Sequence, residues 1–264
     1  MVSPISAVVE RRHVLWTLVR RDLRVRYARS VLGYVWTILD PLMMTLIYFV
    51  VFTFIFKARR VADQPYFLYL ISGMLSWQWF SGATSDTARA LLKEAKLIRS
   101  TNLTRELWVI RVVIAKGIEY LLSLPILVVI FVFYVIRGES GLDYEVVFFP
   151  LGILLQFILL VGMGLILAPV TVLVTDLERV VRIFLRLLFY LTPVIYSLKS
   201  VPDRLRYVIE ANPMTGILSL YRGGLFPSAI SWKSVGVSAT ISVLLLVIGA
   251  RVFTRLERAV LKEI

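Results

Sequence analysis

Thirty consecutive residues, VVFFPLGILLQFILLVGMGLILAPVTVLVT (146–175), contain no charged side chain. A helix needs about 20 mostly apolar residues to cross the hydrocarbon core of a bilayer, so this stretch can span one even when it is tilted or bent. The whole 264-residue chain has the same character, with 59% hydrophobic residues, 18% charged residues and a mean hydropathy of +0.82. This composition excludes an ordinary water-soluble enzyme and also a disordered chain.

Five further segments qualify or nearly qualify as membrane spans. The weakest is 180–198, because Arg182 and Arg186 interrupt it and Pro193 removes a helical hydrogen bond. We therefore predict an all-α membrane protein with six transmembrane helices. The predicted spans cover about 31–56, 64–88, 107–136, 146–175, 180–198 and 234–253.

The distribution of basic residues predicts the orientation of these spans. An even number of spans places both termini on one side of the membrane. On that side the loops and tails hold 20 Lys and Arg residues, against 9 in the other loops. The positive-inside rule then makes the N and C termini cytoplasmic. Anchoring against anionic lipid also explains the net charge of +13, so we expect no nucleic-acid partner.

Three segments outside the spans have predicted roles of their own. Residues 1–30 are expected to form a cytoplasmic amphipathic helix at the membrane interface, ahead of a transmembrane domain at 31–264. Arg26 lies on the apolar side of this helix, which makes its apolar stripe imperfect. Residues 89–106 form a cytoplasmic helical segment, broken near Ser100, that is well placed to contact a soluble partner. Residues 199–233 are apolar for a loop and predict a pair of external re-entrant helices.

Motifs for catalysis are nearly missing from the sequence. The chain has no G-x-x-x-x-G-K-[ST] motif and therefore no ATPase site of its own. It has no cysteine and a single histidine, His13, so thiol catalysis and a metal site are not expected. A membrane enzyme such as a lipid-linked sugar transferase would need acidic or histidine clusters at one membrane face, and none is evident. We predict no catalytic residue, no bound metal and no cofactor in this chain.

Aromatic side chains are frequent in the first, second and fifth predicted spans. Tyr48 and Phe52 are four residues apart and share one helix face. Flat apolar rings could stack on sugar rings along a wide conduit. Trp and Tyr also gather at membrane interfaces and Phe is common on lipid-facing surfaces, so composition alone leaves both interpretations open.

Three segments of the sequence resemble those of a known protein family. They are RRDLRVRYARSVLGYVWTILDPLMMTLIYFVVF (20–52), DLERVVRIFLRLLFYLTPVIYS (176–197) and NPMTGILSLYRGGLF (212–226). In order and spacing they resemble the membrane subunits of ABC-2-type exporters of cell-surface polysaccharides, the O-antigen, capsule, teichoic acid and galactan exporters, over nearly the whole chain. One departure is Leu103-Thr104-Arg105-Glu106, where such proteins often carry Phe-Pro-Arg-Glu, so the local bend is expected to differ.

The resemblance implies a function and partners. It implies a multi-pass permease in the bacterial plasma membrane that exports a lipid-linked polysaccharide or teichoic acid. The permease would act as a homodimer with two copies of a separate ATPase subunit, which binds the ATP and Mg²⁺. An ABC-2 permease for a drug or lipid is the nearest alternative, and a scaffolding membrane protein without an ATPase is a more distant one.

The resemblance also implies three sets of functional residues. The expected substrate channel contains Trp36, Tyr48, Phe52, Phe189, Tyr190 and Tyr196. A pyrophosphate-linked lipid headgroup would need cations at its entrance, and the available ones, which could equally serve as positive-inside anchors, are Arg24, Arg26, Arg29, Arg182 and Arg186. The expected ATPase docking surface consists of Lys93, Glu94, Lys96, Arg99, Asn102 and Arg105.

Overall fold

The computed structural model describes residues 11–28, 30–55, 57, 60–61, 64–101 and 103–263. Within these residues the chain is almost entirely helical, as the sequence predicts. The strands found there are two residues each, β1 (Arg60–Val61) and β2 (Gln64–Pro65), paired antiparallel. Four of the described helical segments are long and apolar enough to cross a membrane, whereas the sequence predicts six spans. These four segments are Gly33–Ile55, Glu106–Ile136, Tyr144–Leu173 and Trp232–Glu263.

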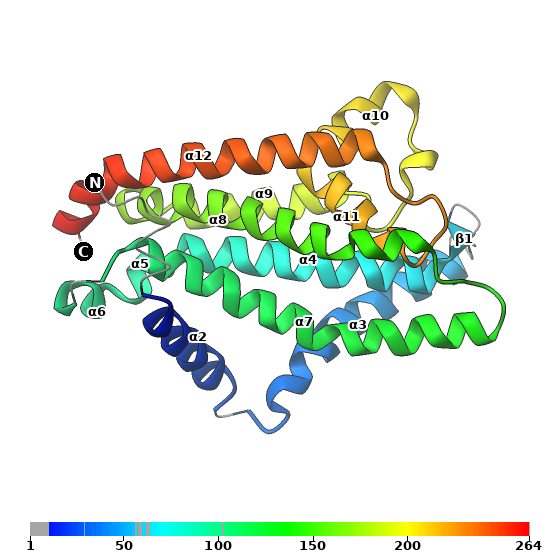
Figure 1. Ribbon diagram of the computed structural model, residues 1–264, viewed down its shortest axis with the longest axis horizontal. Helices are drawn as coiled ribbons and strands as arrows, with labels where there is room; N and C mark the ends of the chain where they lie inside the picture. The colour runs from blue at the N-terminus through cyan, green and yellow to red at the C-terminus, as the bar shows by residue number, and fades with distance from the viewer. Residues whose placement is uncertain are drawn as a thin grey trace.

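From α3 onward the long helices run roughly along one axis, and each points opposite to the long helix before it in the chain (Figure 1). The α-helices are α2 (Arg12–Tyr27), α3 (Trp36–Val50), α4 (Tyr66–Ala88), α5 (Ala90–Lys93), α6 (Ala95–Ser100), α7 (Glu106–Ile136), α8 (Phe149–Leu173), α9 (Leu177–Leu191), α10 (Asp203–Glu210), α11 (Pro213–Gly223) and α12 (Trp232–Glu263). Shorter helical turns are η1 (Gly33–Val35), the π-helical η2 (Val51–Ile55), η3 (Tyr144–Phe148) and η4 (Leu198–Ser200). We call the end of the bundle with α5, α6 and the last turns of α12 the α6 end, and the opposite end, with α10 and α11, the α10 end.

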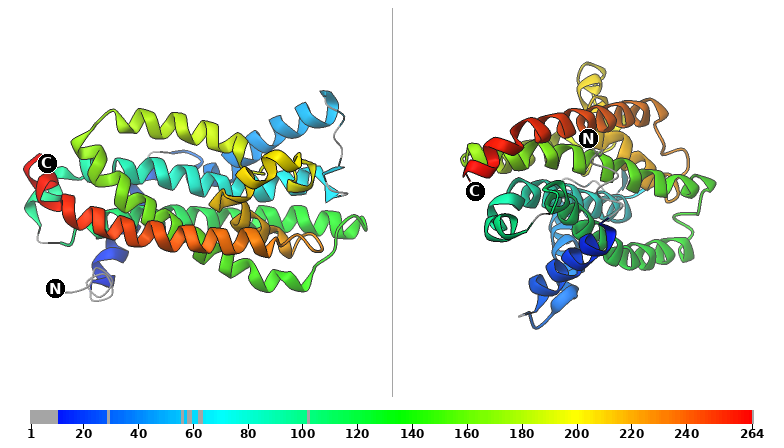
Figure 2. Two further views of the ribbon diagram at one scale, coloured as in Figure 1. Left: turned by 90° about the horizontal axis from the view of Figure 1, so that it is seen from above. Right: turned by 60° about the vertical axis from the view of Figure 1, so that its left-hand side comes forward.

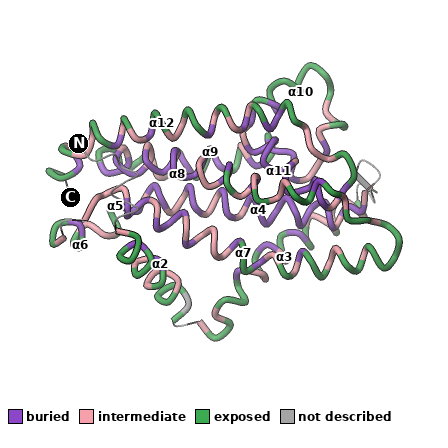
Figure 3. Tube along the Cα trace, in the orientation of Figure 1, coloured by how far each residue is buried: buried purple, intermediate pink, exposed green. Residues whose placement is uncertain are grey.

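Helix α4 forms the centre of the bundle, between α3, α7, α8 and α9. Most of its residues are buried, which Figure 3 shows as a nearly continuous buried tube. Its hydroxyl groups bond to its own backbone, as in Ser76 to the Ser72 carbonyl at 3.1 Å and Thr84 to the Phe80 carbonyl at 2.8 Å. Because α4 faces protein on all sides, it can be less apolar than a helix that faces lipid.

Glycines bring α8 and α12 into close contact. A Cβ atom at Gly162 would lie 2.5 Å from the backbone nitrogen of Leu246, and one at Gly249 would collide with the Gly162 carbonyl. Only glycine permits the two helices to approach this closely. Figure 2 shows α2 and α3 on the opposite side of the molecule from this helix pair.

Helix α9 is shorter than the span predicted at 180–198, because it ends at Leu191. Thr192 is extended, at φ −102° and ψ 134°, since the following Pro193 disfavours the helical conformation at the residue before it. At 1.5 Å per residue, the 15 residues of α9 measure about 22 Å, less than the roughly 30 Å of a hydrocarbon core. Helix α12, in contrast, continues to Glu263, beyond the end predicted at 253.

Helix α2 lies against α7 rather than standing alone. Leu15 and Val19 are buried together with Leu107 and Ala115 of α7. The apolar stripe that predicts an interface helix is therefore partly used for packing within the protein. Trp16, at 46% exposed, remains outside that contact.

Two short helices lie between α9 and α12 at the α10 end, where the sequence predicts helical pieces within 199–233. Helix α10 is exposed on most of its length, whereas α11 is buried against α8, α12 and η3. Asn212 begins α11 by accepting a hydrogen bond from the Met214 N–H at 2.9 Å, and its amide donates to Thr192 Oγ1 at 2.8 Å. This contact joins the end of α9 to the start of α11.

Candidate functional site: an aromatic groove and an ion-pair network

A groove of about 470 Å³ lies between α3, α4 and α9. Two of its walls meet where the rings of Tyr48 and Phe189 stand 5.6 Å apart, and Phe189 contacts Tyr190 at 5.3 Å. Arg186 and Arg182 lie on the same face of α9 as Phe189 and Tyr190, one and two helical turns earlier. The groove is lined by Met44, Tyr48, Met74, Trp77, Ser81, Gly82, Ser85, Arg182, Leu185, Arg186, Phe189 and Tyr190.

The structure brings most of the predicted channel aromatics together. Tyr48, Phe189 and Tyr190 line the groove, and Phe52 adjoins Tyr48 at 6.5 Å from the π-helical turn η2. Tyr196 is connected to this aromatic cluster by a hydrogen bond, because its hydroxyl group donates to the Tyr190 carbonyl at 3.1 Å.

Trp36 is the exception among the predicted channel residues. It is the first residue of α3, twelve positions before Tyr48, which corresponds to about 18 Å along a helix. Its side chain is 45% exposed.

Helix α4 supplies groove residues that are outside the predicted set of channel residues. Trp77 packs on Phe189 with ring centroids 5.4 Å apart. Ser81 and Ser85 follow Trp77 at intervals of four residues, so the three side chains share one helix face. The regular spacing of Ser81 and Ser85 within an uncharged stretch, 66–85, is the signal that could have identified these two residues.

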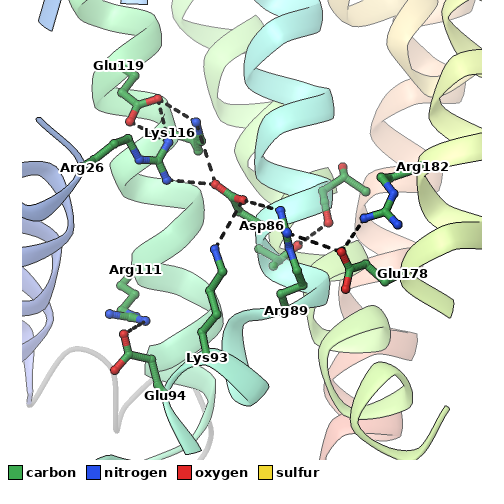
Figure 4. A network of polar contacts seen from close by, with 12 residues as sticks. Arg26, Asp86, Arg89, Lys93, Glu94, Arg111, Lys116, Glu119, Glu178 and Arg182 are labelled. Carbon is green, nitrogen blue, oxygen red and sulfur yellow. Dashed lines mark hydrogen bonds and ion pairs between the residues drawn. The ribbon is translucent and has the colours of Figure 1, made fainter. Parts of the chain in front are cut away.

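An ion-pair network fills the α6 end of the bundle (Figure 4). Asp86 is at its centre and accepts from Arg26 at 2.9 Å and from Arg89 at 3.4 Å. Arg89 also contacts Glu178 at 3.4 Å, and Glu178 accepts from Arg182. A continuous series of charged contacts therefore runs from α2 through α4 to the start of α9, where Arg182 lines the groove.

Glu119 forms a branch of this network on α7. Its carboxylate accepts from Arg26 at 3.2 Å and from Lys116 at 2.8 Å. Lys116 and Glu119 are three residues apart, so their side chains lie on the same side of α7 and can pair. The pairing of Arg26 also explains why an arginine stands on the otherwise apolar side of α2.

A second group of charges surrounds Arg111, whose side chain is only 3% exposed. Its guanidinium donates to Asp22 at 2.8 Å and contacts Glu94 at 3.1 Å. Glu94 is shared with Arg21 of α2. Burial raises the pKa of Asp22, and the positive charges of Arg111 and Arg21 oppose that rise. These contacts hold α2 and the α5–α6 segment against α7.

The predicted headgroup residues fall into different environments. Arg186 and Arg182 line the groove, Arg26 takes part in the network, and Arg24 is exposed near the end of α2. Arg29 lies outside the described residues.

The predicted docking residues divide in the same way. Lys93, Lys96 and Arg99 are exposed on α5 and α6. Glu94 forms ion pairs with Arg21 and Arg111. Arg105 forms an ion pair with Glu257 of α12 at 3.1 Å. Asn102 lies outside the described residues. Beside the exposed cations, Leu92 and Leu97 are 38% and 37% exposed, which gives this surface a mixed apolar and basic character.

Comparison with known proteins adds an independent observation. Residues 13–226 match the sequence model of the ABC-2 type transporter family. The chain is 27% identical over 245 residues to the O-antigen export system permease protein RfbA of Klebsiella pneumoniae, covering 92% of each chain. It is 28% identical to the Myxococcus xanthus protein of the same name, over 96% of each chain. It is also 26% identical to the polysialic acid transport protein KpsM of Escherichia coli, covering 91% of this chain and 92% of that protein.

Proposed function

This chain belongs to the ABC-2 type transporter family, and from that membership we propose that it is the membrane permease subunit of an ATP-driven polysaccharide exporter. Its similarity to O-antigen and polysialic acid permeases extends over nearly their full length, which favours a glycan cargo over a drug or a lipid. The protein is a multi-pass protein of the cytoplasmic membrane. The chemical step that drives transport belongs to a separate ATPase subunit.

The groove between α3, α4 and α9 carries this proposal. It combines aromatic faces with hydroxyl groups and, toward the α6 end, with Arg182 and Arg186. Aromatic rings stack on the apolar faces of sugars without demanding one particular sugar, which suits a long and repetitive cargo. Arginine favours planar, bidentate contact with phosphate, so the two arginines can receive the pyrophosphate of a lipid carrier.

We infer that all six lengthwise helices, α3, α4, α7, α8, α9 and α12, cross the membrane with the α6 end in the cytoplasm. The count of basic residues supports this orientation, and the central position of α4 removes its need for a strongly apolar surface. Because α9 is short, the turn after Leu191 and helices α10 and α11 complete that crossing as external re-entrant structure. Backbone at this depth is tolerated against protein, and α11 is buried.

The exposed surface of α5 and α6 is the proposed contact with the ATPase. Its cations are Lys93, Lys96 and Arg99, and its apolar residues are Leu92 and Leu97. Movement of this surface would reach the groove through the ion pairs of Asp86, Arg89 and Glu178. The partner can shift the permease only by binding one of its states more tightly than the other.

A homodimer is part of the proposal. Two apolar residues that line the groove are also exposed, Met44 of α3 at 46% and Tyr190 of α9 at 60%. A second copy of the chain would close the groove into a conduit for the glycan.

The function is tested by purifying the full chain together with its partner ATPase and reconstituting both in lipid. Lipid-linked glycan should stimulate ATP hydrolysis, and Tyr48→Ala should reduce export about tenfold, as expected from about 1.4 kcal/mol of lost stacking. Phe54→Ala is the matched control, since Phe54 lies on the same α3–η2 helical segment but is 72% exposed outside the groove. Failure of any ATPase to bind, or stimulation by a drug or simple lipid alone, would overturn the proposal.

A further inference from the structure

A second cavity, of about 190 Å³, lies at the α10 end. It is enclosed by the start of α4, the segment after α9, helices α10 and α11, and the segment that leads into α12. One water molecule needs only about 10–15 Å³ of such space, so the cavity can hold a group as large as a phosphate or a sugar carboxylate together with water. Its polar lining includes Ser197, Lys199, Arg206, Ser219, Arg222 and Ser231.

The lining of this cavity is positively charged. Lys199, Arg206 and Arg222 contribute three cations, and hydroxyl groups supply most of the remaining polar surface. Among the described lining residues there is no carboxylate. Glu210 is the nearby acid, and its carboxylate already accepts from Arg206 at 3.2 Å and from Lys233 at 2.6 Å. Two of the three lining cations are therefore left without an acidic partner among the described residues.

Arg222 is the most unusual of these cations, because only 5% of it is exposed. Its side chain donates to the Pro193 carbonyl at 2.7 Å and to the hydroxyl and carbonyl oxygens of Tyr69 at 2.8 and 3.1 Å. It also donates to the Val194 carbonyl at 3.1 Å and to Ser72 Oγ at 3.4 Å. Every partner is neutral, so the hydrogen bonds are satisfied while the charge is not balanced.

A buried charge without an opposite charge is costly, and an anion in the adjoining cavity would lower that cost. All five N–H groups of Arg222 already have acceptors within the protein, so Arg222 acts on such an anion through its charge. Direct hydrogen bonds would come from Lys199, which is exposed, and from Arg206, which is half exposed.

We propose that this cavity is a binding site for an anionic group, the carboxylate or phosphate of a sugar unit or a free oxyanion of the same chemistry. The charge of Arg222 attracts the group, and Lys199 and Arg206 contact it. Anion binding itself does not depend on the transport function. Only the assignment of the natural ligand to an acidic unit of the exported glycan, near the external exit, rests on the proposed function.

The test uses the full chain in nanodiscs of neutral phosphatidylcholine, with glucuronate, inorganic phosphate and glucose as probes for calorimetric titration. Glucuronate or phosphate should bind, and glucose should not. Lys199→Gln and Arg206→Gln should each weaken anion binding about tenfold, the loss of one charged hydrogen bond. Arg204→Gln is the matched control, because Arg204 is an exposed cation on the same helix α10 that does not line the cavity.

These variants are chosen because both side chains reach solvent and their loss leaves the buried contacts of Arg222 in place. Tighter binding of glucuronate than of phosphate would support an acidic sugar unit as the ligand, and the reverse order would support a free oxyanion. The proposal is overturned if neither anion binds, if glucose binds as well as glucuronate, or if Arg204→Gln weakens binding as much as Arg206→Gln. Because no ATPase is present, a failed export assay and a failed anion site remain separate results.

Discussion

Among the described residues, two arginines are almost fully buried, one at each end of the bundle, and their partners differ in kind. Arg111, at the α6 end, is held by the carboxylates of Asp22 and Glu94. Arg222, at the α10 end, is held by backbone carbonyls, a tyrosine and a serine. Both side chains are satisfied in hydrogen bonding, but only the first is neutralised.

This difference in charge compensation suits the two ends of the bundle to different roles. At the α6 end, charges from α2, α5 and α7 compensate one another, so this region behaves as a connected unit that can transmit a movement. At the α10 end, the positive charge is unbalanced beside a cavity, so this region can attract an anion. Arginine thus links helices through ion pairs at the α6 end and supplies an unbalanced positive charge at the α10 end.

The largest expected effect comes from removing the neutralised arginine. Arg111→Met leaves Asp22 and Glu94 partly buried with one cation fewer, and breaking such a pair should lower the free energy of unfolding by about 3 kcal/mol. Thermal unfolding of the full chain in nanodiscs would measure this change. Arg20→Met, an exposed position on α2, is the control and should shift stability by less than about 0.5 kcal/mol. Equal effects of the two variants would contradict the central role of Arg111.

Removing the arginine that has no acidic partner should cost less. Arg222→Met leaves the Pro193 and Val194 carbonyls without their donor, but cavity water can replace it and no buried carboxylate is stranded. We expect a loss of about 2 kcal/mol in the same unfolding measurement. Arg137→Met, at the exposed end of α7, is the control at this end of the bundle. A loss larger than that of Arg111→Met would show that the two arginines do not differ as described.

Substituting Asp86, at the centre of the ion-pair network, should lower the free energy of unfolding by a smaller amount. Asp86→Asn removes the negative charge shared by Arg26, Arg89 and Lys116, but Glu119 and Glu178 remain to pair with these cations. Stability should fall by about 1 kcal/mol, while glycan-stimulated ATP hydrolysis in the reconstituted complex should fall severalfold. Asp176→Asn is the control, since Asp176 is exposed at the same end. Unchanged stimulation in Asp86→Asn would argue against transmission through these contacts.

The smallest effect concerns pH at the α10 end. Hydrogen bonds from Lys233 and Arg206 lower the pKa of Glu210 below its ordinary value of 4.5. Because the folded-state pKa is the lower one, the contribution of Glu210 to stability is full above pH 4.5 and is lost as the pH falls through the folded-state pKa. Glu210→Gln should therefore show a shallower loss of melting temperature than the parent chain on acidification below pH 4.5. Parallel curves for the two proteins would contradict the assigned contacts.

The length and hydropathy of its segments are enough to predict much of this protein's helical architecture. The charge-free run at 146–175 requires a membrane helix, and the break that Pro193 imposes follows from the chemistry of proline. Periodicity places Arg182, Arg186, Phe189 and Tyr190 on one face of a helix, because i, i+4 and i+7 positions align whatever surrounds them. Local signals of this kind depend only on neighbouring residues, and the sequence contains them in full.

Tertiary structure decides which of these residues meet. Nothing local predicts that Arg26 reaches Asp86, 60 residues away, or that Glu94 pairs with Arg111 rather than facing a partner. The neutral surroundings of Arg222 are equally impossible to predict from local sequence, since Tyr69 lies 153 positions earlier in the chain. Compensation of charge depends on distances between helices, and packing alone sets those distances.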